Sequence, residues 1–450
     1  MNTTLHATQR RWWRGPAPEP HPIAGPTYAF EARGRGWDLL LVALAVFILT
    51  SVARLHQLFP VLALFRPVAL TGVAAIALYL VDRIPRRRVR PLEIPATRYL
   101  IALIGWMALS VPGALWQGGA FTTFVDFLKT GLMFLVIVAA VRSIRDVEKL
   151  ALVYFLGAVI FAAVVLSRTS FQMTGDGRME RLYYYDSNDF ATYAITAIPL
   201  GLYFAATGKR LLQVAAWAGT GVLALGFIWS GSRGGFLAFL AVIAYFLLRY
   251  TTINRSWRWS AVAVIAVIVT ATAGDKYWTR IRTIFRPSQD YNLTEDQGRM
   301  KLWRRGIGYM LDHPVLGVGA GNFPRAEGTI SPLVARTPRG RTVKWGPPHN
   351  SYVQVAAELG VVGFLIFCGF FVNVFKALSA LPAAAGPPPA PGDPVPKRRA
   401  RLAQSLTASL IGFAVGSFFL TLAYADMLYA LAGLAVGLRQ VTLNSAPRLP

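Results

Sequence analysis

The chain has 450 residues, of which 54% are hydrophobic and only 15% are charged, and its mean hydropathy is +0.45. A soluble globular protein of this length would be less apolar, so the composition indicates a membrane protein with many spans. The sequence has no alternating ten-residue pattern of the kind that forms a β-barrel, and the spans are therefore expected to be helices. The formal charge of +25 exceeds what membrane orientation alone requires.

The first 36 residues are rich in Pro, Arg and Gly and have no apolar periodicity, so residues 1–36 are expected to form a disordered cytoplasmic tail. This stretch is too long for the leader of an ordinary cleavable signal peptide, and the first apolar segment, near 37–53, is expected to be a retained span. A second span is expected near 61–81. Five arginines follow it directly, between Arg83 and Arg90, and such a cluster is a marker of the cytoplasmic side.

Ten further spans follow in alternation and place both termini inside. They are expected near residues 98–113, 121–141, 150–167, 189–207, 211–229, 235–250, 259–273, 351–376, 402–424 and 427–440. The predicted fold is an all-α polytopic membrane protein with about twelve transmembrane helices, a transmembrane domain at 37–440 and a cytoplasmic tail at 441–450. Every short basic connector then lies inside, as does the Pro- and Ala-rich linker 381–401.

Two longer segments, 168–188 and 274–350, are left outside. The second carries thirteen Lys and Arg against six Asp and Glu, which calls for an anionic partner. Within it, Arg299–Asp312 places apolar residues on one face at helical spacing, which predicts an amphipathic helix lying along the membrane surface.

His349 is the first candidate for chemistry. It follows two prolines at the entry to the span at 351–376, which would hold its ring at the membrane boundary. An imidazole can accept a proton from a hydroxyl near neutral pH. The alternative is a histidine in a segment that only caps the next helix through Asn350 or Ser351.

Arginines of the outer side are the second set of candidates. Arg233 lies in the turn Ser230–Gly235, where glycines let backbone N–H groups approach a ligand and the guanidinium can hold phosphate oxygens. Arg299, Arg304 and Arg305 lie in the amphipathic helix. The alternatives are an arginine that reaches toward lipid headgroups at Arg233 and solvated charges in the helix.

The segment 178–191 combines aromatic, acidic and amide side chains, as a sugar site does. Tyr184, Tyr185, Asp186 and Asn188 are its candidate glycan-binding residues. The same composition fits an interfacial aromatic belt with an Asp or Asn helix cap.

Ionisable residues within the expected spans are the last candidates. Asp126 and Lys129 can form a functional pair or neutralise each other on one helix face, and Asp426 lies near the turn between the last two spans. Cys368 is alone, so no intramolecular disulfide or cysteine metal site is expected. Without a Walker, HExxH or Asp-x-Asp motif, no metal and no cofactor are predicted.

In four outer segments the chain resembles the O-antigen ligase and O-antigen polymerase superfamily (Wzy-C). These segments are Asp186–Ala191, the Ser-Arg-Gly-Gly turn at Arg233, His313–Gly319, and His349–Tyr352 with Glu358–Gly360. The resemblance implies a GT-C-type fold and metal-independent, inverting transfer of a glycan from undecaprenyl diphosphate to a hydroxyl in the outer leaflet. It implies that His349 is the catalytic base and that Arg233 and Arg299 bind the diphosphate, with Arg304 or Arg305 as substitutes for Arg299.

The resemblance leaves two activities open. A ligase moves a glycan onto lipid A-core or another glycan or protein acceptor, whereas a polymerase extends a lipid-linked chain. The expected partners are the undecaprenyl-diphosphate-linked donor, an acceptor and membrane lipids, without nucleic acid. The expected location is the bacterial inner membrane, with the site facing the periplasm or exterior. A third hypothesis is a non-enzymatic polysaccharide transporter. A transporter would be expected to have charges along a path near the middle of the membrane, whereas the cations here gather in one outer loop, which favours an enzyme.

Overall fold

The computed structural model describes residues 36–54, 58–81, 93–168, 186–272, 274–282, 295, 298–336, 343, 345–381 and 394–445. All regular structure in these ranges is helical. The expected tail up to residue 35, the arginines between Arg83 and Arg90, most of the linker 381–401 and much of both outer segments lie outside the described residues.

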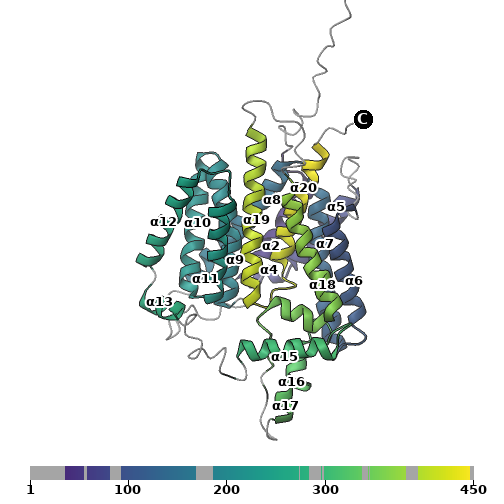
Figure 1. Ribbon diagram of the computed structural model, residues 1–450. Helices are drawn as coiled ribbons and strands as arrows, with labels where there is room; N and C mark the ends of the chain where they lie inside the picture. The colour runs from purple at the N-terminus through teal and green to yellow at the C-terminus, as the bar shows by residue number, and fades with distance from the viewer. Residues whose placement is uncertain are drawn as a thin grey trace, which may run out of the picture.

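Long helices stand beside one another as a bundle (Figure 1). They are α2 (Leu39–Val52), α5 (Pro67–Val81), α6 (Pro95–Ser110), α7 (Gln117–Ala140), α8 (Ile144–Arg168), α9 (Ser187–Thr207), α10 (Arg210–Ser230), α11 (Arg233–Arg249), α12 (Arg255–Thr272), α18 (Ser351–Ser379), α19 (Pro394–Gly416) and α20 (Asp426–Ser445). Each overlaps one of the segments predicted to span the membrane.

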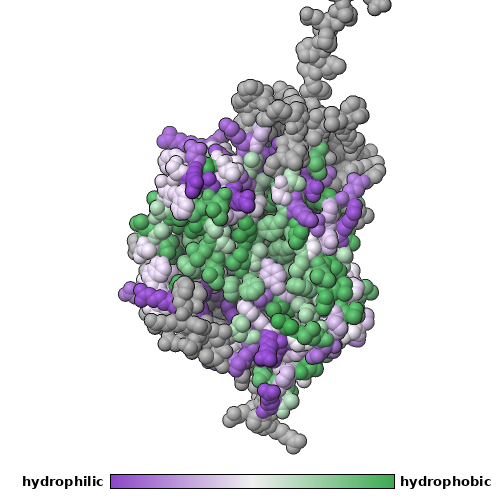
Figure 2. Space-filling model, viewed as in Figure 1, coloured by the Kyte–Doolittle hydropathy of each residue, from purple (hydrophilic) through white to green (hydrophobic). Residues whose placement is uncertain are grey.

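Six stretches of the described chain are long and apolar enough to cross a membrane, namely α7, α8, α9, α10, α18 and Pro396–Phe419. Figure 2 shows hydrophobic side chains gathered around the middle of the molecule and hydrophilic ones toward its two ends. The chain is therefore a multi-pass membrane protein, as its composition predicts.

Short helices lie at one end of the bundle. α15 (Arg299–Asp312) lies across that end, and α13 (Asp275–Arg282) lies at the same end next to the end of α12. α16 (Phe323–Thr329) and α17 (Pro332–Arg336) project beyond α15, whereas α20 ends at the opposite end of the bundle (Figure 1). The helix predicted at Arg299–Asp312 is confirmed. Its apolar residues face two ways, because Leu302 and Tyr309 are buried in the protein while Ile307 and Leu311 are exposed.

Three spans differ in detail from the prediction. The segment expected at 61–81 is divided into α4 (Pro60–Ala63) and α5, with Arg66 in a left-handed conformation between them at φ 42°. α19 begins at Pro394, within the linker expected at 381–401, and ends at Gly416. A short 3-10 helix, η5 (Ser417–Phe419), and a loop follow it.

The third difference is a break in α18 at Gly360, whose φ of 69° and ψ of −172° are not helical. A Cβ at Gly360 would lie 2.5 Å from the carbonyl oxygen of Pro314, so a backbone segment packs directly on the break. The N–H groups of Val318 and Gly319 donate to the carbonyls of Ala357 and Glu358 at 2.9 and 3.0 Å. These bonds satisfy carbonyls that a helix end leaves open. The run His313–Gly319 therefore caps the first part of α18.

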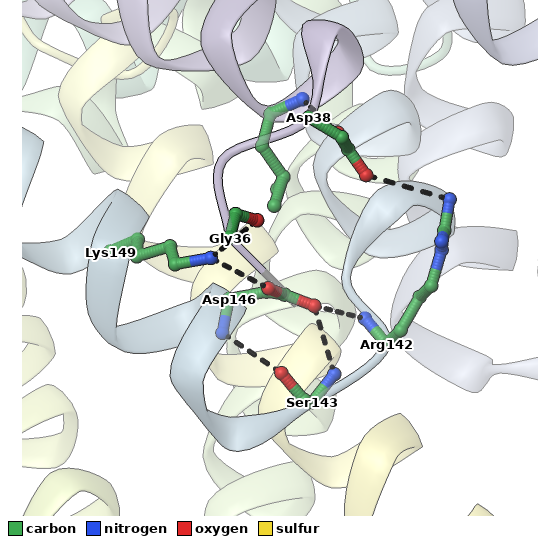
Figure 3. Close-up of polar contacts among 7 residues, drawn as sticks. Gly36, Asp38, Arg142, Ser143, Asp146 and Lys149 are labelled. Carbon is green, nitrogen blue, oxygen red and sulfur yellow. Dashed lines mark hydrogen bonds and ion pairs between the residues drawn. The ribbon is translucent and has the colours of Figure 1, made fainter. Parts of the chain in front are cut away.

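Ion pairs tie the helices together at the end opposite α15. At the start of α8, the Asp146 carboxylate accepts hydrogen bonds from the N–H groups of Arg142 and Ser143 and pairs with Lys149 at 3.5 Å (Figure 3). Arg142 also lies 3.7 Å from Asp38, which caps α2. These basic residues were predicted to indicate the cytoplasmic side of the membrane, and the structure shows that they also connect helices.

A buried carboxylate continues this pattern. Glu148 of α8 pairs with Arg398 of α19, whose Nη2 lies 2.7 Å from Oε2, and it also accepts a hydrogen bond from Tyr203 of α9. α9 packs against α8, α10, α11 and α19, so it forms the centre of this half of the bundle. The start of α9 consequently has a fixed place at the α15 end.

Candidate active site

The start of α9 is built by the segment Asp186–Asp189. Asp186 Oδ1 accepts hydrogen bonds from the N–H groups of Asn188 and Asp189 at 2.7 and 2.9 Å, and Asp189 Oδ2 accepts from Asp186 N–H at 3.2 Å. This reciprocal capping box is the helix cap that the sequence left open as an alternative. Asn188 also connects the start of α9 to the turn before α11, because its Oδ1 accepts a hydrogen bond from Ser232 Oγ at 2.8 Å. Tyr184 and Tyr185 lie outside the described residues.

The turn around Arg233 packs against this cap. Ser232 caps α11 by accepting a hydrogen bond from Gly235 N–H at 3.0 Å, and Arg233 is the first residue of that helix. A Cβ at Gly235 would lie 2.7 Å from Cβ of Ala191 in α9, and one at Gly234 would lie 2.8 Å from Cβ of Phe419. Only glycine permits both approaches. The turn is thereby fixed to α9 on one side and to η5 on the other, with the half-buried Arg233 at its outer end.

Arg299 is the first residue of α15 and is also half-buried. Its charge acts on the carboxylate of Asp189, as does the charge of Arg54, which follows α2. Arg299 therefore lies near the start of α9. Arg54 has a left-handed backbone at φ 49° and was not singled out from the sequence, because it belongs to no motif or cluster.

Arg305 has a different environment from Arg299. Its guanidinium holds the buried Glu327 of α16, with Nη2 at 2.6 Å from Oε2 and Nε at 2.9 Å from Oε1. Tyr309 donates to the same carboxylate at 2.8 Å. Burial alone would lower the pKa of Arg305, but the hydrogen bonds and charge of Glu327 raise it above its ordinary value. Arg305 thus joins α15 to α16, while Arg304 is exposed on the next position of the helix.

His349 has a left-handed backbone, with φ at 49°. Such a conformation is uncommon outside glycine and persists only where its surroundings hold it. Here the N–H of His349 donates to Thr421 Oγ1 at 3.0 Å. Two residues on, Ser351 Oγ donates to the carbonyl of Leu420 at 2.8 Å and accepts from the N–H of Leu422 at 2.9 Å. The loop after η5 therefore fixes the backbone at His349.

Asn350 caps α18, since its side chain accepts from the N–H groups of Tyr352 and Val353 at 2.9 and 3.1 Å. Asn350 therefore provides the helix cap that the sequence offered as an alternative for this segment. Glu358, in the same part of α18, is buried and accepts from the N–H of Phe323 at 3.3 Å. This hydrogen bond attaches the start of α16 to α18.

Trp303 connects the separate segments. One turn after Arg299, its indole N–H donates to the carbonyl of Pro348 at 2.9 Å, next to His349. Its ring packs edge-on against Phe418 of η5, with centroids 5.2 Å apart. The start of α9, the Arg233 turn, the start of α15 and the His349 segment thus gather around η5 at one end of the bundle. We call this assembly the outer site.

The ionisable residues of the spans lie apart from these contacts. Lys129 Nζ lies 2.7 Å from Asp126 Oδ1 on α7, so the mutual pairing considered from the sequence is formed. Asp426, at the start of α20, accepts a hydrogen bond from Thr130 Oγ1 and ties α20 to α7.

Residues 218–368 match the family model described as O-Antigen ligase. A curated protein of Rickettsia conorii, named "Putative polysaccharide ligase", is 22% identical over 220 residues, which cover 44% of this chain and 51% of that protein. The chain thus spans about half the length of the curated relative it matches. Arg233, Arg299 and His349 all lie within residues 218–368, and over that range the chain's resemblance to the O-antigen ligase family is confirmed.

Proposed function

We propose that the chain is an O-antigen ligase-like glycosyltransferase that moves a glycan from undecaprenyl diphosphate to an acceptor hydroxyl. The observation that carries the proposal is the gathering of Arg233, Arg299 and His349 around η5, although they are far apart in sequence. Two cations and a histidine with a fixed backbone, brought to the same end of the bundle, match a reaction in which a diphosphate leaves and a hydroxyl must lose its proton.

In the proposed step, the imidazole of His349 accepts the proton of the acceptor hydroxyl. The hydroxyl oxygen attacks the anomeric carbon, and the bond from that carbon to the diphosphate oxygen breaks with its electron pair on the oxygen. Attack opposite the leaving group inverts the anomeric configuration. Arg233 and Arg299 stabilise the charge that develops on the diphosphate, so the chain's own cations supply the electrostatic term and we write the step without a metal.

Other residues of the outer site have supporting roles in this proposal. Asn188 holds the Arg233 turn, and Arg305 holds α15 to α16. Of the two arginines that could substitute for Arg299 in binding the diphosphate, Arg304 is therefore the one that remains, and it is exposed. Tyr184, Tyr185 and Asp186 remain the proposed contacts of the sugar.

We also propose the membrane arrangement. Each of the twelve segments predicted to span overlaps a helix, and the proposal is that all twelve cross an inner membrane in a GT-C-like fold with the α15 end outside. Basic residues paired at the opposite end support this orientation, since cytoplasmic ends carry an excess of Lys and Arg. Labelling of single cysteines placed at positions 304 and 397 from each side of sealed membranes tests it, with the native Cys368 replaced.

The chemical step is tested with His349→Asn and Arg233→Gln in purified protein. Asn is preferred to Ala because it tolerates the left-handed backbone observed at His349. Loss of the base should lower transfer by roughly 10²- to 10⁴-fold and leave binding of the lipid-linked donor intact. Arg233→Gln should weaken both. Full transfer by His349→Asn would refute the mechanism.

The choice between ligase and polymerase is tested in cells that lack the protein. Accumulation of undecaprenyl-linked polymer that is not attached to an acceptor indicates a ligase, whereas accumulation of single repeat units indicates a polymerase. Wild-type glycan in both respects would refute an enzymatic role.

A further inference from the structure

A groove lies between α11, α18 and α19 and extends away from the outer site. Its volume is about 1040 Å³, at the upper end of the range of roughly 300–1,000 Å³ for small-molecule sites. Most of its length is apolar and is lined by α18 residues such as Phe371 and Phe375 and by α19 residues such as Ala403. Near the His349 segment the groove meets Tyr352, whose hydroxyl donates to the carbonyl of Ala414 at 3.0 Å and joins α18 to α19.

Three cations line the other end of the groove. Arg249 comes from the last turn of α11, Lys376 from the last turn of α18, and Arg399 from the second turn of α19. The helix dipole favours a cation at the first two places, but Arg399 lies near a helix N-terminus and gains nothing from it. A common ligand explains all three positions better than helix ends do.

No carboxylate balances these cations within the described residues. The groove lining contains neither Asp nor Glu, and none of the three side chains forms an ion pair in the described part of the chain. Neighbouring cations at this end behave differently, since Arg142 and Lys149 face Asp38 and Asp146 (Figure 3). Within the described residues, the mouth of this apolar groove therefore carries three cations without a carboxylate beside them.

The part of the groove between Lys376 and Cys368 fits a lipid of one leaflet. Cys368 lines the groove eight residues before Lys376, which places it roughly 12 Å away along α18 at 1.5 Å per residue. Half of a hydrocarbon core of ~30 Å is about 15 Å. A phosphate held by the three cations would thus place acyl chains beside Phe375, Phe371 and Cys368.

We propose that this groove binds an anionic phospholipid, with its phosphate at Arg249, Lys376 and Arg399 and its acyl chains along α18 and α19. In the proposed orientation this lipid belongs to the cytoplasmic leaflet. The undecaprenyl donor is a different ligand, because its diphosphate binds at the opposite end of the bundle. The site stands independently of the transfer chemistry and requires no covalent step.

Lipid retention tests the proposal in the full-length protein. Protein reconstituted in vesicles of equal phosphatidylglycerol and phosphatidylcholine is re-extracted in detergent, and its bound lipids are measured by native mass spectrometry. We expect the wild type to retain phosphatidylglycerol preferentially. The variant Arg249→Gln/Lys376→Gln/Arg399→Gln should lose on the order of 100-fold in affinity, since each cation near an anionic lipid contributes about fivefold.

The matched control removes the same charge elsewhere at this end. Lys209, Arg210 and Arg255 are exposed and do not line the groove, so changing all three to Gln should preserve retention. Equal retention by the groove variant and the wild type would overturn the proposal. Displacement of phosphatidylglycerol by undecaprenyl phosphate would also overturn it, because the groove would then hold the donor's prenyl chain.

A second measurement needs no substitution at the cations. Cys368 is the only cysteine of the chain, so alkylation by a membrane-permeant maleimide reports on the groove alone. Wild-type protein in vesicles that contain phosphatidylglycerol should be alkylated several-fold more slowly than in pure phosphatidylcholine. Equal rates in the two membranes would contradict occupancy by an anionic lipid.

Discussion

The ion pair between Arg305 and Glu327 offers the sharpest test of how the outer site is held together. Glu327 is 1% exposed and Arg305 is 11% exposed, so Glu327→Gln leaves a cation facing a neutral amide in a largely buried place. Removing one partner of a buried pair costs about 3–5 kcal/mol. We expect the lower end, about 3 kcal/mol, because the long arginine side chain can turn toward water.

This cost should appear as local opening, since the pair joins α15 to α16 and not one long bundle helix to another. Amide hydrogen exchange within α15 should therefore accelerate on the order of 100-fold, while exchange in α9 is unchanged. Arg304→Gln, one position earlier on the same helix, is the matched control because Arg304 is exposed. The double variant Arg305→Gln/Glu327→Gln should recover part of the loss, since no buried charge is left unpaired.

Transfer activity gives the functional readout of the same variant. Opening of α15 displaces Arg299 and Trp303 together, so Glu327→Gln should lower donor binding and transfer in parallel. If its α15 exchange rates equal those of Arg304→Gln, the ion pair does not hold the helix, and the reasoning is refuted.

Three further substitutions test other contacts. Arg54 is a further cation near Asp189, and Arg54→Gln should weaken binding of the lipid-linked donor roughly 10- to 100-fold, because a charge-assisted contact contributes roughly 1.5–3 kcal/mol; unchanged donor binding would show that Arg54 does not contact the donor. Gly360→Ala should lower stability by about 2–3 kcal/mol in thermal unfolding, since its φ is 69° and a backbone oxygen lies 2.5 Å from the added Cβ. In the control Gly105→Ala, the added Cβ has no neighbouring atom within 4 Å, and stability should be unchanged. Ser351→Ala removes both hydrogen bonds to the loop that holds His349, so transfer should fall while donor binding is kept. Ser379 is exposed on the same helix, and Ser379→Ala should leave transfer and donor binding unchanged. Equal transfer activity of the two variants would contradict the role of Ser351 in holding His349.

Hydrophobic periodicity and charge were sufficient to locate the long helices and α15, but not the short helices α13, α16 and α17. The amphipathic run Arg299–Asp312 was predicted with its final bounds because its 3.6-residue spacing, the preceding Gly298 and the following His313-Pro314 all indicate the same helix. The break at Gly360 could not be predicted in this way. It depends on Pro314 and Val318, which approach from a segment that is remote in sequence and whose contacts leave no periodic signal.

The candidate residues show the same division between local and tertiary information. Asp186 as a helix cap follows from local sequence, since an Asp three residues before another acidic residue is a capping signal. The different roles of Arg299 and Arg305 do not follow from local sequence, because both are arginines of one helix and only the position of Glu327 distinguishes them. Arg54 is the extreme case, an isolated arginine whose proximity to Asp189 arises only from folding.

The contacts of α15 explain how a long loop can serve one site. The pairing of Val318 and Gly319 with α18 attaches the loop to the bundle, and Arg305–Glu327 and Trp303–Pro348 tie the loop to itself. Trp303 lies one helical turn from Arg299, and Pro348 directly precedes His349, so this last bond spans the whole intervening chain. The separation between the proposed diphosphate-binding arginine and the proposed base therefore depends on one helical turn and one hydrogen bond. Loss of the Trp303 indole, as in Trp303→Leu, should consequently disturb the transfer geometry and lower transfer.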